Sequence, residues 1–222
     1  MVYHVLNRAN GRHPLFETDG DFLAFETVMA QARERHDMRI LAWCLMPNHW
    51  HLVLWPRNDG DLSDFMGWLT LTHTQRWHAH RQSAGTGHLY QGRFKSFPVQ
   101  DDEHFLTVCR YVERNALRAN LVRRAEAWRW GSLAVYADGG PRTELLSAWP
   151  IRRSPHWIDC VNHPQTEGEV AAIRRSIQRG RPFGDEGWTK KAAAELDLET
   201  TLIPRGRPKK QPDNPGTRNK GS

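Results

Sequence analysis

The chain has 222 residues, of which 39% are hydrophobic and 25% charged, so it is long and apolar enough to bury one main core. It contains no apolar run long enough to span a membrane and no signal peptide pattern at its start, which favours a cytoplasmic protein. Its three cysteines form no CxxC pair, so neither a disulfide framework nor a cysteine zinc cage is supported.

The net charge of +6 is distributed unevenly along the chain, because five of these charges lie in residues 204–222. This tail is rich in Pro, Gly and basic residues, and we expect residues 203–222 to be disordered. Arg-Gly-Arg-Pro occurs at 179–182 and again at 205–208, and it resembles the core of an AT-hook, whose arginines enter a minor groove. The tail is then either a solvated linker or a duplex DNA contact made by Arg205, Arg207, Lys209 and Lys210.

Residues 1–122 alternate between strand and helix patterns. Short apolar runs bounded by turn residues predict strands, and apolar residues at a 3.6-residue period after capping residues predict helices. The predicted elements are a strand at 2–8, a helix from the caps at 19–21 to about 32, strands at 38–46 and 49–55, a helix at about 61–81, a strand at 88–99 and a helix after 102. Gly92 predicts a bend in the strand 88–99, and Pro98 places that strand near a sheet edge.

This β-α-β-β-α-β order followed by a helix is typical of the ferredoxin-like, split βαβ fold. We therefore expect an α+β fold with an antiparallel sheet and helices on one face. After residue 122 the patterns weaken, and the sequence predicts only short helices near 167–179 and 189–196 in a tryptophan-rich C-terminal extension.

His49 and His51 lie two residues apart in the predicted strand 49–55. Both imidazoles therefore project from the same face, while Trp50 points to the other. Such a pair can bind one metal ion. Taken alone the pattern is weak, because one surface histidine and one packed histidine give the same spacing.

The helix after residue 102 carries a second candidate group. Its apolar stripe leaves Tyr111 and Asn115 as neighbours on another face. A tyrosine oxygen can act as a covalent nucleophile when a nearby metal or base helps to remove its proton, and the Asn115 amide oxygen can complete the coordination of a hard cation. The alternative interpretation is a tyrosine packed at the boundary between helix and sheet with its hydroxyl exposed.

Basic residues near both groups suit a phosphate-bearing ligand. The segment 92–95 combines a flexible backbone, two cations and an aromatic ring, a composition suited to phosphate contact and base stacking, although an ordinary edge strand explains it equally well. The candidate DNA-binding residues of the folded part are Arg93, Lys95, Arg110, Arg114 and Arg118.

Together these side chains have the chemistry needed for phosphodiester cleavage. Two histidines and an oxygen ligand can hold a divalent ion that polarises the phosphate, and Tyr111 can attack in line. The phosphotyrosine product keeps the energy of the broken bond, so a DNA 3′-hydroxyl can reverse or redirect the reaction without ATP.

Five sequence blocks contain these groups: YHVLNR at 3–8, WCLMPNHWHL at 43–52, GHLYQGRFKS at 87–96, CRYVERNALRA at 109–119 and WRWGS at 128–132. They resemble the REP-associated tyrosine transposases, within the IS200-type, single-tyrosine branch of the HUH endonucleases. The resemblance covers residues 2–135 or so.

By this resemblance Tyr111 would be the nucleophile, His49 and His51 metal ligands, and Asn115 the third ligand where related insertion-sequence enzymes use glutamine. The family implies cutting and joining of single-stranded DNA beside a REP-like hairpin, through a 5′-phosphotyrosine intermediate, with Mg²⁺ or Mn²⁺. It also implies a cytoplasmic, nucleoid-associated protein, either monomer or homodimer.

The expected organisation is an HUH catalytic domain at 1–135, an extension at 136–202 and a basic tail at 203–222. The alternative function is a catalytically idle nucleic-acid-binding module, since ferredoxin-like sheets also bind single strands.

Overall fold

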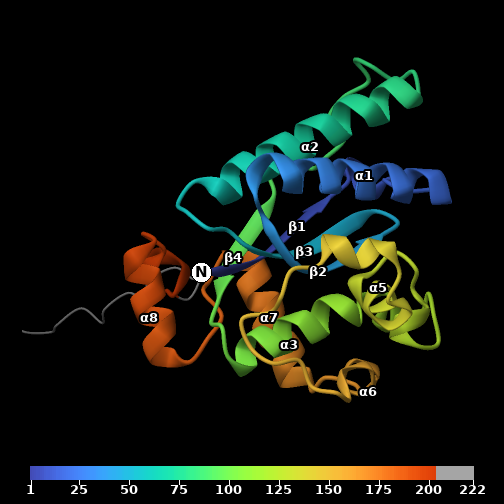
Figure 1. Ribbon diagram of the computed structural model, residues 1–222. Helices are drawn as coiled ribbons and strands as arrows, with labels where there is room; N and C mark the ends of the chain where they lie inside the picture. Colours follow the sequence, from blue (N-terminus) through green and yellow to red (C-terminus); the bar gives the residue numbers. More distant parts are fainter. Residues whose placement is uncertain (204–222) are drawn as a thin grey trace, which may run out of the picture.

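The computed structural model of the protein describes residues 1–203, apart from the side chain of Arg12. Its centre is an antiparallel sheet of strands in the order β2-β3-β1-β4 (Figure 1). The strands are β1 (Val2–Arg8), β2 (Arg39–Met46), β3 (His49–Trp55) and β4 (Lys95–Val99). Because β3 lies between β1 and β2, and β1 lies between β3 and β4, each βαβ unit is split by another strand. The ferredoxin-like fold is confirmed.

Two long helices, α1 (Asp19–His36) and α2 (Asp61–His80), cover one face of this sheet (Figure 1). The first begins at a capping box, in which the Thr18 side chain accepts a hydrogen bond from the Asp21 amide and the Asp21 carboxylate accepts one from the Thr18 amide. Strand residues such as Trp43 and Trp50 pack with these helices in one apolar core.

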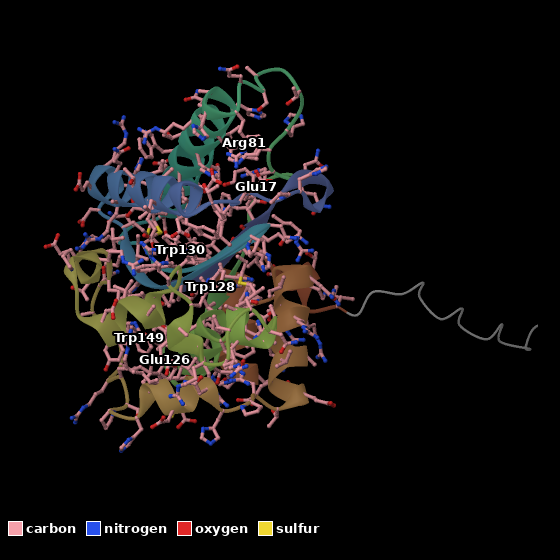
Figure 2. All side chains as sticks on the ribbon, turned by 90° about the vertical axis from the view of Figure 1, so that its right-hand side faces the viewer. Glu17, Arg81, Glu126, Trp128, Trp130 and Trp149 are labelled. Atoms are coloured by element: carbon pink, nitrogen blue, oxygen red, sulfur yellow. The ribbon has the colours of Figure 1, made fainter. Side chains whose placement is uncertain are left out.

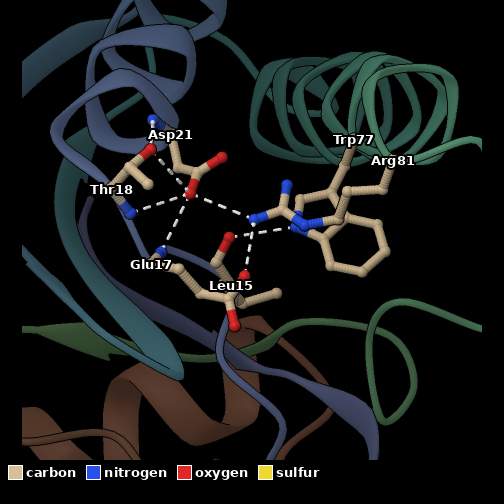
Figure 3. A network of polar contacts seen from close by, with 6 residues as sticks. All are labelled: Leu15, Glu17, Thr18, Asp21, Trp77 and Arg81. Atoms are coloured by element: carbon tan, nitrogen blue, oxygen red, sulfur yellow. Dashed lines mark hydrogen bonds and ion pairs between the residues drawn. The ribbon is translucent and has the colours of Figure 1, made fainter.

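A polar network joins the end of α2 to the start of α1 (Figure 3). Arg81 donates to the Asp21 carboxylate at 3.0 Å and stacks on the Trp77 ring, whose indole N–H donates to the Leu15 carbonyl at 3.0 Å. Burial raises the pKa of Asp21, but the hydrogen bonds from Arg81 and two backbone amides lower it to about 2. This carboxylate therefore holds the two helices together in its charged form.

The expectation of helices on one face holds only for α1 and α2, because helices cover the second face as well (Figure 1). β2 is buried along nearly its whole length, and a strand that is apolar on both faces needs a packed layer on each. The second layer contains α3 (Glu103–Glu113), α4 (Asn115–Arg118), α5 (Ser132–Asp138), α6 (Trp157–Asn162) and α7 (Glu167–Arg179). The last α-helix of the described part is α8 (Glu186–Glu195), and short 3₁₀ helices lie at Asn10–Arg12, Ala125–Ala127, Pro141–Leu145 and Glu199–Thr201.

The sequence predicts a strand over 88–99, but only Lys95–Val99 forms a regular strand. The prediction is therefore wrong for residues 88–94. Gly87 has a φ of 122°, which other residues rarely adopt and which turns the chain before this segment. Tyr90 then forms an isolated bridge with Ala9, and the Gly92 carbonyl accepts a hydrogen bond from the Asn7 side chain at 3.1 Å. Residues 90–92 are therefore held at the end of β1 by individual contacts and not by a continuous β-ladder.

The tryptophan-rich segment after residue 122 covers the β2 edge of the sheet. The indole N–H groups of Trp128 and Trp149 donate to the carbonyls of Leu45 and Leu41, each at 2.8 Å. Both side chains are partly buried against the core, and Trp130 is buried (Figure 2). An uncovered edge strand is a template for aggregation, so these tryptophans serve the fold as anchors.

The β4 edge is covered by the segment after α7. The Phe183 amide donates to the Pro98 carbonyl at 2.9 Å, in a parallel bridge beside β4. The first Arg-Gly-Arg-Pro copy leads into this bridge: Arg179 ends α7 and bonds the carbonyl of Ile203, and Gly180 takes the left-handed cap conformation at φ 70°. This copy therefore belongs to the fold and is no extended AT-hook, while the second copy lies outside the described residues.

Helices of the extension complete the core of the second layer. Trp157, Val161 and Ile173 are buried in the same cluster as Val108 and Val112 of α3. α7 matches the predicted helix 167–179, whereas α8 begins three residues before the predicted 189 because Asp185 caps it. A domain boundary at residue 135 stays a prediction. Within residues 1–203, no helix combines the length and apolar character needed to cross a membrane.

Candidate active site

The second face of the sheet gathers histidines and cations from three strands. β1 contributes His4 and Arg8, β3 contributes His49 and His51, and β4 contributes Lys95. Arg8 is paired with His49 in the antiparallel ladder, and residues opposite each other in a ladder share a face. The two histidines of the HxH pair thus lie on one face, as their spacing predicts.

Both imidazoles of this pair are held through their Nδ1 atoms. Nδ1 of His51 lies 2.9 Å from Nε2 of His4, and Nδ1 of His49 lies 2.7 Å from Oδ1 of Asn48. The ring centroids of His49 and His51 are 5.1 Å apart. Metal-binding histidines are typically oriented in this way by a partner at the other ring nitrogen, which leaves Nε2 of His49 and His51 for a ligand.

Burial keeps the three imidazoles neutral. It lowers the pKa of His4 to about 3, that of His49 to about 4 and that of His51 well below its ordinary value. The positive charges of Arg8 and Arg118 lower the pKa of His49 further. Because a metal binds the neutral imidazole, the ligand nitrogens need lose no proton at neutral pH.

Tyr111 of α3 faces these histidines. Its ring meets those of His51 and His4 edge-on, with centroids 6.0 Å and 6.4 Å apart, and the residue is 6% exposed. α3 holds it there because the apolar stripe that includes Phe105 and Val108 packs against the sheet. The structure thus brings together the tyrosine and the histidine pair, which are far apart in sequence.

Arg118 fixes Tyr111 from another side. Its guanidinium carbon lies 4.0 Å from the centroid of the tyrosine ring, and Nη1 donates to the Tyr111 carbonyl at 3.3 Å. This carbonyl lies near the junction at which α3 ends and α4 begins. Burial lowers the pKa of Arg118, but a guanidinium stays charged in proteins. Arg118 therefore orients the ring and adds a permanent positive charge beside it.

Asn115 is the first residue of α4 and is buried, with 7% exposure. Its Nδ2 has no hydrogen-bond partner among the described residues, and a buried amide left incomplete costs free energy. Residues 1–203 contain no group of three His, Cys, Asp or Glu side chains able to hold a metal ion. The oxygen of Asn115 with His49 and His51 would form a donor set that suits a divalent ion, and the role of Asn115 as a ligand stays a prediction.

Two of the predicted DNA-binding arginines have partners inside the protein. Arg110 donates to the carbonyls at 163–164 at 3.1 Å and 2.9 Å, and Arg114 donates to those at 161–162. These guanidinium groups hold the end of α6 and the two residues after it against α3. Their contact with DNA stays a prediction.

Other cations remain without an acidic partner. Arg93 and Lys95 line a groove of about 440 Å³ together with Arg8. In the described part of the chain none of these three side chains, nor Arg118, forms an ion pair. Unpaired cations around a groove attract a polyanion. The predicted contacts of the tail, Arg205, Arg207, Lys209 and Lys210, lie outside the described residues.

His4 and Arg8 belong to this site although sequence reasoning did not nominate them. Strand alternation was the available signal, because side chains at 4, 6 and 8 of β1 must share one face. The sequence does not show that the histidines of β3 project from this same face.

The family model of IS200-like transposases matches residues 1–115, just over half of the chain. Among solved structures, the protein is similar to a REP-associated tyrosine transposase bound to a REP hairpin, with a TM-score of 0.50 and 15% identity over 69% of this chain and 88% of that one. It is also similar to a protein of Deinococcus radiodurans R1 described as a transposase, with a TM-score of 0.40 and 18% identity over 51% and 88% of the two chains.

The comparison with curated proteins gave no match. At 15% identity the likeness to the hairpin-bound structure shows a common fold. The family match includes β1, the HxH strand, Tyr111 and Asn115. The chain thus belongs to the family of IS200-like transposases, which are DNA-cleaving enzymes.

Proposed function

We propose that the protein is a metal-dependent, single-tyrosine endonuclease and strand transferase that acts on single-stranded DNA beside REP-like hairpins. The observation that carries this proposal is the position of the Tyr111 ring, 6.0 Å from the ring of His51. A potential nucleophile, a pair of neutral imidazoles and unpaired cations meet on one face of the sheet. The hairpin bound in the similar transposase structure supports hairpin DNA as the substrate.

The tyrosine oxygen performs the cleavage step. Oη of Tyr111 attacks the scissile phosphorus and forms the tyrosine–phosphate bond, while the bond from phosphorus to the 3′ oxygen breaks. Tyr111 loses its hydroxyl proton in this attack and the leaving 3′ oxygen takes up a proton, so the products are a 5′-phosphotyrosine and a free 3′-hydroxyl. One phosphodiester replaces another, so attack by a 3′-hydroxyl on the phosphotyrosine rejoins DNA without ATP.

His49, His51 and Asn115 would hold Mg²⁺ or Mn²⁺, which supplies positive charge to the phosphate when bound. His4 bonds Nδ1 of His51 and so orients that ring. Arg118 keeps the tyrosine ring in position and attracts the phosphate.

The test is a search for the covalent adduct. The protein is incubated with labelled single-stranded hairpin DNA from the flanks of its gene, with Mn²⁺ or Mg²⁺, and separated on a denaturing protein gel. We expect a metal-dependent shifted band that is absent with Tyr111→Phe, although that variant binds DNA as before. Tyr136→Phe, at an exposed tyrosine of α5, is the matched control and should form the adduct.

An adduct formed by Tyr111→Phe would assign the nucleophile to another residue. Tight binding by the wild-type protein without cleavage or adduct would instead favour the idle binding module.

A further inference from the structure

Helix α7 of the C-terminal extension lies beside α3 and β4 (Figure 1). Its Ile177 lines the same groove as Arg8, Arg93 and Lys95. The groove is thus bounded by strand residues on one side and by a helix of the extension on another. α7 lies beyond the residues that the family match covers.

Arg174 adds a cation to this side of the site. It lies three residues before Ile177, so the two side chains are neighbours on the helix surface. It is exposed, and no acidic residue of the described chain forms an ion pair with it. Burial lowers the pKa of Arg118, and the positive charge of Arg174 lowers it further. Arg174 also lines a neighbouring hollow of α7 together with Gln165 and Gln178.

Arg8, Arg93 and Lys95 line the groove, Arg118 lies over the Tyr111 ring, and Arg174 lies on α7 next to the groove residue Ile177. Like charges held together raise the free energy of the folded protein, and a bound polyanion offsets this cost. The groove has a volume of about 440 Å³, which is within the range of sites that hold small ligands. Sites that bind single strands have a positively charged groove that follows the backbone, and Arg8, Arg93 and Lys95 supply that charge here.

We propose that α7 forms one wall of the groove that holds the DNA strand next to the scissile phosphate. Arg174 neutralises a backbone phosphate of this single strand, and Ile177 contacts the adjacent sugar or base. The extension then takes part in substrate binding as well as in the fold. This inference rests on the proposed function, because it assumes that DNA enters the face with Tyr111.

The test compares two neighbouring arginines of α7 in the full chain. Binding of a labelled, mixed-sequence single-stranded oligonucleotide is measured by fluorescence anisotropy over a range of NaCl concentrations. Arg174→Gln should reduce the slope of log K against log salt by about 0.7, which corresponds to about fivefold weaker binding at about 0.1 M NaCl. Arg175→Gln removes the same charge from the next residue, also exposed, and should change neither slope nor affinity.

Equal losses in the two variants would mean that α7 contributes only general charge, and the inference would be wrong. In that case an adduct on Tyr111 would still support the proposed function. If the wild-type chain neither binds the oligonucleotide nor forms the adduct, both proposals fail.

Discussion

Nε2 of His4 lies 2.9 Å from Nδ1 of His51, and the two rings stack with their centroids 5.0 Å apart. His4 is completely buried, and its other ring nitrogen has no partner among the described residues. Its one polar contact is therefore with a candidate metal ligand. This contact fixes the ring orientation of His51 and directs the opposite nitrogen, Nε2, to a ligand.

His4→Phe keeps a ring in contact with Phe97 but removes the hydrogen bond to His51. We expect Mn²⁺ affinity to fall by about 10-fold to 100-fold, because partners of metal ligands typically contribute that much. Calorimetric titration with Mn²⁺ measures the loss, and excess Mn²⁺ should restore adduct formation. Tyr3→Phe, on the same strand but the other face, is the control. An unchanged Mn²⁺ affinity would mean that His4 contributes only to packing.

Asn115→Ala removes one of the proposed metal ligands and should weaken Mn²⁺ binding less than His49→Ala or His51→Ala does. Asn115→Asp retains an oxygen donor and adds negative charge, so it should recover the affinity lost in the alanine variant. The Mn²⁺ concentration for half-maximal adduct formation reports both effects. If Asn115→Ala changes only DNA affinity, the assignment of this residue as a ligand is wrong.

Arg118→Lys separates the positioning of Tyr111 from the charge beside it. Lysine keeps the positive charge but loses the planar stacking on the Tyr111 ring. It also loses the guanidinium N–H that donates to the Tyr111 carbonyl. A loss of about 1 kcal/mol would slow cleavage about fivefold at saturating DNA. DNA affinity should stay as it is, and Arg123→Lys, an exposed arginine outside this contact, should behave like wild type. Weaker binding at an unchanged cleavage rate would identify Arg118 as a phosphate contact only.

Local patterns sufficed for much of the fold. The run 49–55 between turn residues predicts β3 as it is found, and the period of two along a strand places His49 and His51 on one face. The 3.6-residue period likewise predicts the buried stripe of α3, although it places Tyr111 on another face and the structure buries that side chain in the same core. These features depend on residues close in sequence, so a single sequence reveals them.

Contacts between distant segments could not be read in this way. The bond between His4 and His51 depends on the register of β1 against β3, which alternation alone does not specify. Arg110 and Arg114 have the composition of a DNA contact, yet they bind carbonyls about fifty residues further along the chain. The sequence predicts α3 and α7 as helices, but not that helices cover the second face of the sheet, because the weak patterns after residue 122 do not indicate where that segment packs.

The extension should prove necessary for folding of the catalytic part. Glu113 of α3 is buried and accepts hydrogen bonds from Ser132 at 2.7 Å and from the indole of Trp157 at 2.6 Å. Trp157→Phe leaves this carboxylate one donor short, at a cost of about 1–3 kcal/mol in the free energy of unfolding. Urea titration measures this cost, and Trp68→Phe, at a partly buried tryptophan of the other core, is the comparison.

A chain that ends at residue 135 loses Trp157, Val161 and Ile173 from the second core altogether. We expect it to aggregate or to unfold without a cooperative transition. Cooperative unfolding of residues 1–135 alone would instead establish the predicted catalytic domain as an independent unit.

Stability should fall as the pH is lowered, because buried histidines are held neutral. His73 bonds the Tyr90 hydroxyl at 2.7 Å, and burial, with the nearby charge of Arg81, lowers its pKa to about 3. The unfolded chain titrates near 6.5, so between these values it binds more protons than the folded chain does. The free energy of unfolding should then drop by about 1.4 kcal/mol per pH unit for each such histidine below about pH 6.

His73→Gln can still bond Tyr90 but cannot take up the proton, so its stability should fall less steeply with pH than that of the wild type. Urea titrations between about pH 7 and pH 5 measure how steeply the free energy of unfolding of each protein depends on pH. The difference between the two slopes should approach the value for uptake of one proton on unfolding. His88→Gln, at an exposed histidine, should leave the wild-type slope unchanged. Equal slopes for wild type and His73→Gln would show that His73 takes up its proton in the folded protein as readily as in the unfolded chain.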